Sequence, residues 1–207
     1  SLVAAANGIH LSRCASFGNA IILDVSDYLE YLTEDDETEV IGMYVEGVKN
    51  GRRFFEVLKD ACKKKPVIVW KGGQTEAGAR ATMSHTGSLA APHAIWEAMV
   101  KQCGAISTNN LDETIDVMKL LRMAKKPTGN GMALLAQTGG QSVSITDAFA
   151  RQGFRIPRFT HATYETLGEF FNISGGSYRN PLDAGGTIGM GFVPGNLQKL
   201  FDILEED

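Results

Sequence analysis

Val67-Ile-Val-Trp70 is followed directly by Lys71-Gly-Gly-Gln-Thr75, and this junction indicates the class of architecture. Four apolar residues, three of them β-branched, predict a buried strand. The paired glycines predict a tight turn, after which the chain leads towards a helix. A buried strand with a glycine-rich turn at its carboxyl end is typical of a parallel sheet covered by helices.

The same alternation continues on both sides of this junction. Apolar runs typical of buried strands alternate with stretches that keep a helical period. We expect helices at residues 25–32, 52–64, 95–102 and 112–124, and strands at residues 11–17, 40–45, 67–70 and, less strongly marked, 105–107. This order predicts an α/β fold built on a parallel sheet.

A segment with proline and glycine, residues 125–131, interrupts the pattern and predicts a domain boundary. We therefore expect one domain at residues 1–126 and a second at residues 127–207. The second series predicts strands at 132–137 and 154–157 and helices at 143–152, 163–170 and 197–204. So small a sheet predicts an incomplete second domain. Residues 1–7 resemble the end of a helix, so both ends fit a piece cut from a larger polypeptide.

Composition excludes several classes of protein. The chain has 207 residues, 43% hydrophobic content and a net charge of −4, which argues against a disordered chain and against a nucleic-acid reader. No apolar run reaches the roughly 18–20 residues that a membrane helix needs. The three cysteines, Cys14, Cys62 and Cys103, form no metal or redox motif. We expect them to be small buried residues of a cytoplasmic protein that binds no metal.

His85 is the main candidate for chemistry. It lies in residues 71–90, a stretch rich in glycine and small residues that we expect to form a loop at the carboxyl ends of the strands, where parallel sheets bind ligands. Ser84, Thr86 and Ser88 can cap a following helix, whose N-terminus favours an anion. A neutral imidazole there can attack a phosphoryl group. The alternative is a loop histidine with a structural hydrogen bond.

Glu46 is the second candidate. It follows the expected strand at residues 40–45, so its carboxylate can reach the same edge of the sheet as the His85 loop. A carboxylate that accepts one ring N–H fixes the tautomer of a histidine and leaves the other nitrogen as a nucleophile. The alternative is a helix-capping or solvated acid. A weaker candidate for cofactor binding at this edge is the end of the first expected strand, with Ser16, Gly18 and Asn19.

A second glycine turn occurs in the other half of the chain. Thr138-Gly139-Gly140-Gln141 follows an expected strand and opens an expected helix, an arrangement that suits a phosphate. It lacks the later glycine of the dinucleotide fingerprint and the Walker lysine, so a plain tight turn is the alternative. Asn180-Pro-Leu-Asp183 is expected to enter a strand, which would bring Asp183 near the ligand-binding edge.

Together these motifs resemble the ligase region of the NDP-forming acyl-CoA synthetases, relatives of succinyl-CoA synthetase that include the ADP-forming acetate–CoA ligases. The most specific part is Glu76-Ala-Gly-Ala-Arg80 followed by Ser84-His-Thr-Gly-Ser-Leu-Ala90. The supporting motifs fall in the family's order and cover nearly the whole chain: Ser16-Phe-Gly-Asn19, Tyr44-Val-Glu-Gly47, Lys65-Pro-Val-Ile-Val69, Thr138-Gly-Gly140 and Asn180-Pro-Leu-Asp183.

The resemblance implies two flavodoxin-like domains and a mechanism. An acyl phosphate forms from acyl-CoA and phosphate, a histidine takes the phosphoryl group, and the phosphohistidine delivers it to ADP; the reverse direction forms acyl-CoA from an acid, CoA and ATP. His85 matches the phosphorylated histidine, and Glu46 matches the acid that holds its ring. The paired helix ends that hold the phosphate match Thr86-Gly87-Ser88 and Gly139-Gly140-Gln141.

The resemblance also implies partners. Such enzymes need a CoA-binding domain and an ATP-grasp domain, in the same chain or in a partner subunit, and these 207 residues contain neither. CoA and ATP or ADP would be substrates, Mg²⁺ would belong to the absent nucleotide domain, and the assembly would be an oligomer. We expect this chain to hold the phosphohistidine site without completing a turnover alone.

Two other functions are compatible with the sequence. Related chains fused to protein acetyltransferases resemble small-molecule sensors, so this chain could be a non-catalytic regulatory module. The pair of His85 and Glu46 favours the enzyme, because a sensor does not need both. A general flavodoxin-like nucleotide or flavin binder is the third reading, and the loops lack an obvious flavin phosphate-binding run.

Overall fold

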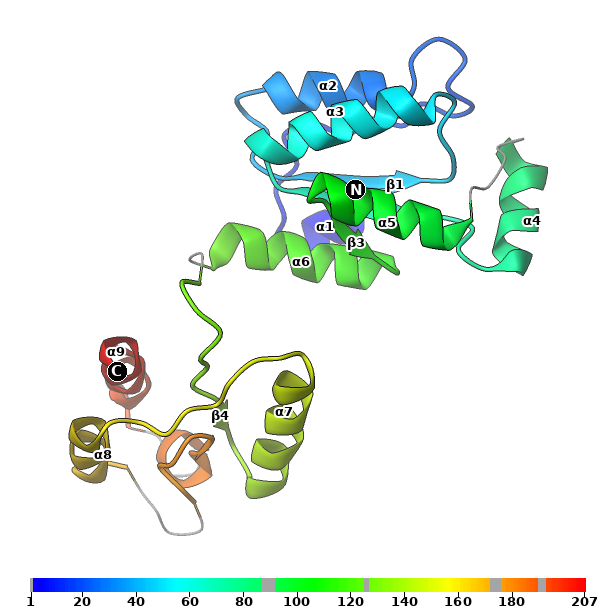
Figure 1. Ribbon diagram of the computed structural model, residues 1–207. Helices are drawn as coiled ribbons and strands as arrows, with labels where there is room; N and C mark the ends of the chain where they lie inside the picture. Colours follow the sequence, from blue (N-terminus) through cyan, green and yellow to red (C-terminus); the bar gives the residue numbers. More distant parts are fainter. Residues whose placement is uncertain (1, 87–91, 125–126, 172–175, 190–192) are drawn as a thin grey trace. The chain divides into compact units, whose positions relative to one another are not determined.

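The computed structural model describes residues 2–86, 92–124, 127–171, 176–189 and 193–207. Within these ranges the chain forms two compact units, Ser1–Lys126 and Pro127–Asp207 (Figure 1). Each unit has its own cluster of buried apolar side chains. Among the described helices, none is both long and apolar enough to cross a bilayer.

The first unit is a parallel sheet with helices on both faces. Its sheet has the order β1-β2-β3, and β2 is the central strand. Helices α2 and α3 lie on one side of this sheet, and α1 and α6 lie on the other (Figure 1). In chain order the elements are α1 (Leu2–Ala6), α2 (Val25–Glu34), β1 (Ile41–Val45), α3 (Gly51–Lys64), β2 (Val67–Lys71), α4 (Glu76–Thr86), α5 (His93–Cys103), β3 (Ile106–Thr108) and α6 (Leu111–Met123).

The core of the first unit follows from two sequence periods. In β2, Val67, Ile68 and Val69 are all buried, as expected of a strand that is covered on both faces. In α3, residues Phe54, Leu58 and Ala61 recur at helical spacing and are fully or almost fully buried. The ring of Phe54 stacks on Trp96 of α5 with 5.6 Å between ring centroids, which fixes α5 against α3. The predicted α/β class is therefore confirmed.

One predicted strand of the first unit is wrong. Residues 11–17 form no strand, and all but Phe17 are exposed. A strand needs a neighbour that satisfies its backbone N–H and C=O groups. Instead, residues from the start of the chain and from β1 line a groove of about 120 Å³, among them Ile9, Leu11, Ile41 and Gly42.

The expected loop at residues 71–90 is also partly wrong. Residues 76–86 form helix α4, so the loop after β2 is short. Ala77, Ala79 and Ala81 are strong helix formers, and the hydroxyl of Thr75 accepts a hydrogen bond from the N–H of Gly78 at 3.1 Å in the first turn. The glycine and the hydroxyl residues of this segment favour a loop, but the helix propensity of the alanines is the stronger effect.

The second unit is a smaller parallel α/β arrangement. Strands β4 (Leu135–Ala136) and β5 (Leu182–Asp183) pair in parallel, with Ala136 opposite Asp183. The helices are α7 (Gly139–Arg151), α8 (His161–Gly168) and α9 (Asn196–Glu206), and a π-helical turn, η1, spans Gly185–Gly189. The core consists of Phe159, Leu167, Phe171, Leu182, Ala184 and Leu200.

The side chain of Asn180 joins three segments of this unit. Its amide donates hydrogen bonds to the carbonyls of Met132 and Pro157, both at 2.8 Å, and accepts one from the N–H of Leu134 at 3.0 Å. The strand predicted at residues 154–157 is wrong, because only one isolated bridge forms there, between Gly131 and Arg155. A single side chain therefore ties together backbone that a longer sheet would otherwise pair.

The core of the first unit gives a direct prediction. Leu58 is fully buried, so Leu58→Ala should lower the free energy of unfolding of this unit by about 2–5 kcal/mol, because it removes buried methyl groups and leaves a cavity. Leu120→Ala is the matched control, since Leu120 is 63% exposed and its loss should cost less than about 0.5 kcal/mol. Denaturant unfolding followed by tryptophan fluorescence measures both. Equal losses would contradict the assigned core.

Candidate functional site

The carboxyl ends of β1 and β2 place Glu46 and Gly72 side by side. Val45 and Lys71 are opposite each other as the last pair of the two strands. The residue that follows each strand therefore leaves the sheet at the same edge. The Lys71 ammonium bridges the two, donating to the carbonyl of Glu46 at 2.7 Å and to that of Gly72 at 2.5 Å. This edge is where parallel sheets bind their ligands, as predicted for Glu46.

Tyr44 holds the side chain of Glu46. Its hydroxyl donates to Glu46 Oε1 at 3.1 Å, and its ring packs against Trp70 with 4.7 Å between centroids. Burial, together with the hydrogen bond and the negative charge of Glu46, raises the pKa of Tyr44, so the phenol stays a donor at neutral pH. A Cβ on Gly72 would lie 2.5 Å from the Tyr44 hydroxyl, so a larger residue there would displace the Tyr44 side chain.

The turn after β2 is built on a second glycine. Gly73 has φ +70°, and a Cβ there would lie 2.8 Å from Oγ1 of Thr82 on α4. The left-handed backbone and the close contact both exclude larger residues. This turn fixes the start of α4 directly after the edge of the sheet that carries Glu46.

His85 lies in the last turn of α4, rather than in the loop that the sequence predicts. The side chains of Ser84, His85 and Thr86 are outside the described part of the structure, and so are residues Gly87 and Ser88. Ser84 and Thr86 belong to α4, and neither caps α5, the next helix among the described residues, whose N-cap is Pro92. The pairing of His85 with Glu46 stays a prediction.

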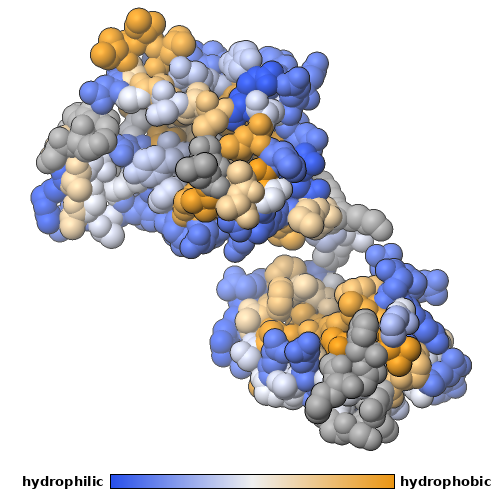
Figure 2. Space-filling view, turned by 180° about the vertical axis from the view of Figure 1, so that it is seen from behind, coloured by the Kyte–Doolittle hydropathy of each residue, from blue (hydrophilic) through white to orange (hydrophobic). Residues whose placement is uncertain are grey.

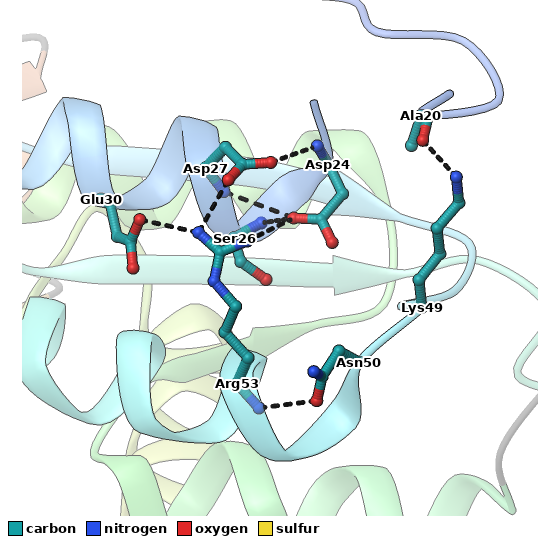
Figure 3. A network of polar contacts seen from close by, with 8 residues as sticks. All are labelled: Ala20, Asp24, Ser26, Asp27, Glu30, Lys49, Asn50 and Arg53. Carbon is teal, nitrogen blue, oxygen red and sulfur yellow. Dashed lines mark hydrogen bonds and ion pairs between the residues drawn. The ribbon is translucent and has the colours of Figure 1, made fainter. Parts of the chain in front are cut away.

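The loop that carries Ser16, Gly18 and Asn19 is exposed and lies on the same edge of the first unit. Lys49, three residues after Glu46, donates a hydrogen bond to the carbonyl of Ala20 and so fastens this loop to the turn after β1 (Figure 3). Ile21, Ile22 and Leu23, which follow, are exposed as well. The hydropathy view shows apolar surface at one end of this unit (Figure 2).

A network of acids around Arg53 joins the first turns of α2 and α3 (Figure 3). Asp24 caps α2 by accepting from the N–H groups of Ser26 and Asp27, while the Asp27 carboxylate accepts from the N–H of Asp24 at 2.7 Å. The Arg53 guanidinium contacts Asp27 at 2.7 Å and Glu30 at 2.8 Å. The bond from the Asp24 N–H and that from Arg53 lower the pKa of Asp27.

In the second unit, Gly139, Gly140 and Gln141 form the first turn of α7, as predicted. Thr138 is the N-cap, and its hydroxyl accepts from the N–H of Gln141 at 3.2 Å. Asp183, at the end of β5, lies at the same strand ends, because a Cβ on Gly139 would be 3.3 Å from Asp183 Oδ2. This carboxylate is a negative charge beside a helix N-terminus that otherwise suits an anion.

The cysteines lie outside these sites. Cys103 is buried and Cys62 half-buried, but Cys14 is exposed, so the expectation of three buried residues is wrong for Cys14 because the segment at residues 11–17 joins no sheet. Burial raises the pKa of Cys62 to about 11, so its thiol is protonated at neutral pH. Within the described ranges, no three His, Cys, Asp or Glu side chains are grouped to hold a metal ion.

Two residues of this edge were not singled out from the sequence. In the sequence, Tyr44 is only one member of the motif Tyr44–Gly47, and Lys71 is the first residue of the expected loop. The sequence does carry a signal for Lys71. This charged residue directly follows the apolar run Val67–Trp70, and the last residue of a central strand is expected to be buried, which is rare for lysine.

The ion pairs of Arg53 predict a pH dependence of stability. Because the folded-state pKa of Asp27 lies below its unfolded value, its contribution to stability is present above about pH 4 and is lost as the pH falls through the folded pKa. Arg53→Met should therefore lower the denaturant midpoint at pH 7, with a difference from wild type that narrows in acid. Arg52→Met, on the same turn of α3, is the control and should show no such trend.

The chain was compared with known proteins. Residues 2–121 match the family described as the succinyl-CoA ligase like flavodoxin domain. An ADP-forming acetate–CoA ligase I of Archaeoglobus fulgidus is 39% identical over 97% of this chain, which spans 28% of that protein. The alpha subunit of an ADP-forming acetate–CoA ligase II of Pyrococcus furiosus is 39% identical over 84% of this chain, and the match spans 38% of that subunit.

A solved structure agrees with these relatives. A dinucleotide-forming acetyl-coenzyme A synthetase 1 of Ca. Korarchaeum cryptofilum, in complex with phosphate and ADP, superposes with a TM-score of 0.79 at 30% identity. The match covers 97% of this chain and 50% of that chain. This chain therefore spans half or less of the length of each relative.

Proposed function

The chain belongs to the succinyl-CoA ligase like flavodoxin domain family, and on this premise we propose that it is the ligase region of an NDP-forming acyl-CoA synthetase. The observation that carries the proposal is the extent of the similarity, since relatives named as ADP-forming acetate–CoA ligases match 97% and 84% of this chain, across both units. The position of Glu46 at the carboxyl edge of the sheet supports the same function.

The chemistry that we propose is transfer of a phosphoryl group through a histidine. A neutral ring nitrogen of His85 attacks the phosphorus of an acyl phosphate, the N–P bond forms, and the bond from phosphorus to the acyl oxygen breaks, so that the acid leaves as a carboxylate. The phosphohistidine then transfers the group to ADP. The acyl phosphate itself forms when phosphate displaces CoA from acyl-CoA.

We assign Glu46 the task of accepting one ring N–H of His85. This hydrogen bond would fix the tautomer and stabilise the positive charge that the ring gains as it attacks. Tyr44 supports the assignment, because its hydroxyl donates to Glu46 Oε1 and so holds the carboxylate in one orientation.

The phosphate-binding residues that we propose are Thr86, Gly87 and Ser88 in the first unit and Gly139, Gly140 and Gln141 in the second. Thr86 is the last residue of α4 that the structure describes, and Gly87 and Ser88 lie outside the described residues. The first turn of α7 has the favourable polarity, with Gly139 and Gly140 as N1 and N2 residues whose N–H groups lie outside the helical ladder.

The partners that we propose are a CoA-binding domain and an ATP-grasp domain, and the phosphoryl group passes from His85 to ADP on the second. One relative is named as an alpha subunit, which supports a division of the enzyme among several chains. CoA and ATP or ADP are then substrates that bind outside the two units described above.

Labelling of the full-length protein tests the proposal. With γ-phosphate-labelled ATP, the wild-type protein should take up acid-labile, base-stable label, and His85→Ala should remove it because the variant lacks the ring nitrogen that forms the N–P bond. His93→Ala is the matched control, since His93 is exposed at the start of α5 and should leave the label unchanged. Label that persists in His85→Ala, or a wild-type protein that takes up none, contradicts the proposed enzyme; the second result favours a sensor.

Glu46 gives a separate expectation. Glu46→Gln keeps the size of the side chain and removes its charge, so the rate of labelling should fall by about 100-fold or more while the melting temperature stays close to that of wild type. Glu39→Gln, at the opposite end of β1, is the control. A labelling rate equal to that of wild type would leave Glu46 as a structural acid.

A further inference from the structure

Lys71 is a buried charge that the proposed chemistry leaves unused. It is the last residue of β2, and only 3% of its surface is exposed. Lysine is among the residues that are almost never fully buried unless they are paired. Among the described residues its ammonium forms no ion pair with a carboxylate, and its hydrogen bonds go to two backbone carbonyls, those of Glu46 and Gly72.

The burial of this ammonium is costly. Removal of its water lowers the pKa of Lys71, and the negative charge of Glu46 opposes that effect only in part. A methionine would fill the same volume without a desolvation cost, as apolar replacements of buried ions often do. Stability of the sheet is therefore a poor reason for a lysine at this position.

The geometry gives a better reason. The hydrogen bond from the N–H of Gly72 to the carbonyl of Val45, at 2.9 Å, is the last one between the backbones of β1 and β2. Beyond it the two segments separate, and the one after β1 leads to α3 while the one after β2 leads to α4. The Lys71 ammonium contacts both segments, through the carbonyl of Glu46 in the first and the carbonyl of Gly72 in the second.

The ammonium is itself held by a rigid aromatic surface. It lies 5.5 Å from the centroid of the Trp96 ring, within the range of a cation–π contact. Trp96 is buried and stacks on Phe54, a fully buried residue of α3. The position of Lys71 is thus determined from α3 and α5 as well as from β2, which makes it a fixed point against which Glu46 is placed.

We infer that Lys71 is a positioning residue for Glu46: its buried ammonium fixes the backbone of Glu46 relative to the turn that leads to α4 and His85. This inference rests on the proposed function, because it assigns Lys71 to the same phosphohistidine site. Lys71 touches neither the phosphoryl group nor the ring of His85 in this account. It acts only through Glu46.

The test is a double-mutant cycle in the full-length protein, with labelling by γ-phosphate-labelled ATP as the readout. Lys71→Met should reduce the labelling rate by about 10- to 100-fold, since small displacements of positioning groups have effects of this size. The melting temperature of Lys71→Met should equal or exceed that of wild type. Lys101→Met, on the exposed face of α5, is the matched control and should change neither quantity.

The second half of the cycle separates positioning from a merely structural role. If Lys71 acts through Glu46, the variant with both Lys71→Met and Glu46→Gln should label at the rate of Glu46→Gln alone. Effects that multiply independently would overturn the inference, as would a Lys71→Met protein that labels like wild type. If Lys71→Met lowers the melting temperature, Lys71→Gln replaces it in the same cycle, with the same non-additivity required.

The outcomes also distinguish this inference from the proposed function. Label that does not depend on His85 contradicts the enzyme as a whole. Label that depends on His85 and on Glu46 but not on Lys71 contradicts only the positioning role.

Discussion

The parallel pairing of β1 with β2 is the constraint on which the functional edge depends. Because Val45 and Lys71 are the last opposed pair, the residues that follow them leave the sheet together, and Glu46, Gly72 and the turn to α4 occupy one edge. A shift of the register of β2 by one residue would turn its alternating side chains to the opposite face. The burial of β2 on both sides prevents such a shift, since its apolar residues already fill the core.

The sequence predicts the parts of the fold that rest on local chemistry. Residues such as Phe54 and Leu58 recur at helical spacing, and Val67–Val69 form a short apolar run, so α3 and β2 follow from the order of residues alone. The place of Glu46 follows too, because any residue after a parallel strand lies at that edge. The first turn of α7 was predicted for the same reason, from Gly139 and Gly140 after an expected strand.

The remaining features depend on contacts that no local pattern encodes. The segment at residues 11–17 has the composition of a strand, yet no backbone partner completes it, and residues from the start of the chain and from β1 line a groove instead. The sequence predicts a loop in place of α4, because Gly78 and the hydroxyl residues are typical of loops. The alanines favour a helix, and the hydrogen bond from the N–H of Gly78 to the Thr75 hydroxyl stabilises its first turn. The burial of Lys71 depends on Trp96, which lies 25 residues further along the chain.

Ala20 adopts φ +52°, a left-handed conformation that disfavours a residue with a Cβ by roughly 1–2 kcal/mol. The carbonyl of Ala20 accepts the hydrogen bond from Lys49, so this bond is made at the residue whose backbone is strained. The strained backbone of this loop is thus held by a hydrogen bond from Lys49, three residues after Glu46. A rearrangement at the end of β1 that displaced Lys49 would therefore leave the carbonyl of Ala20 without this donor.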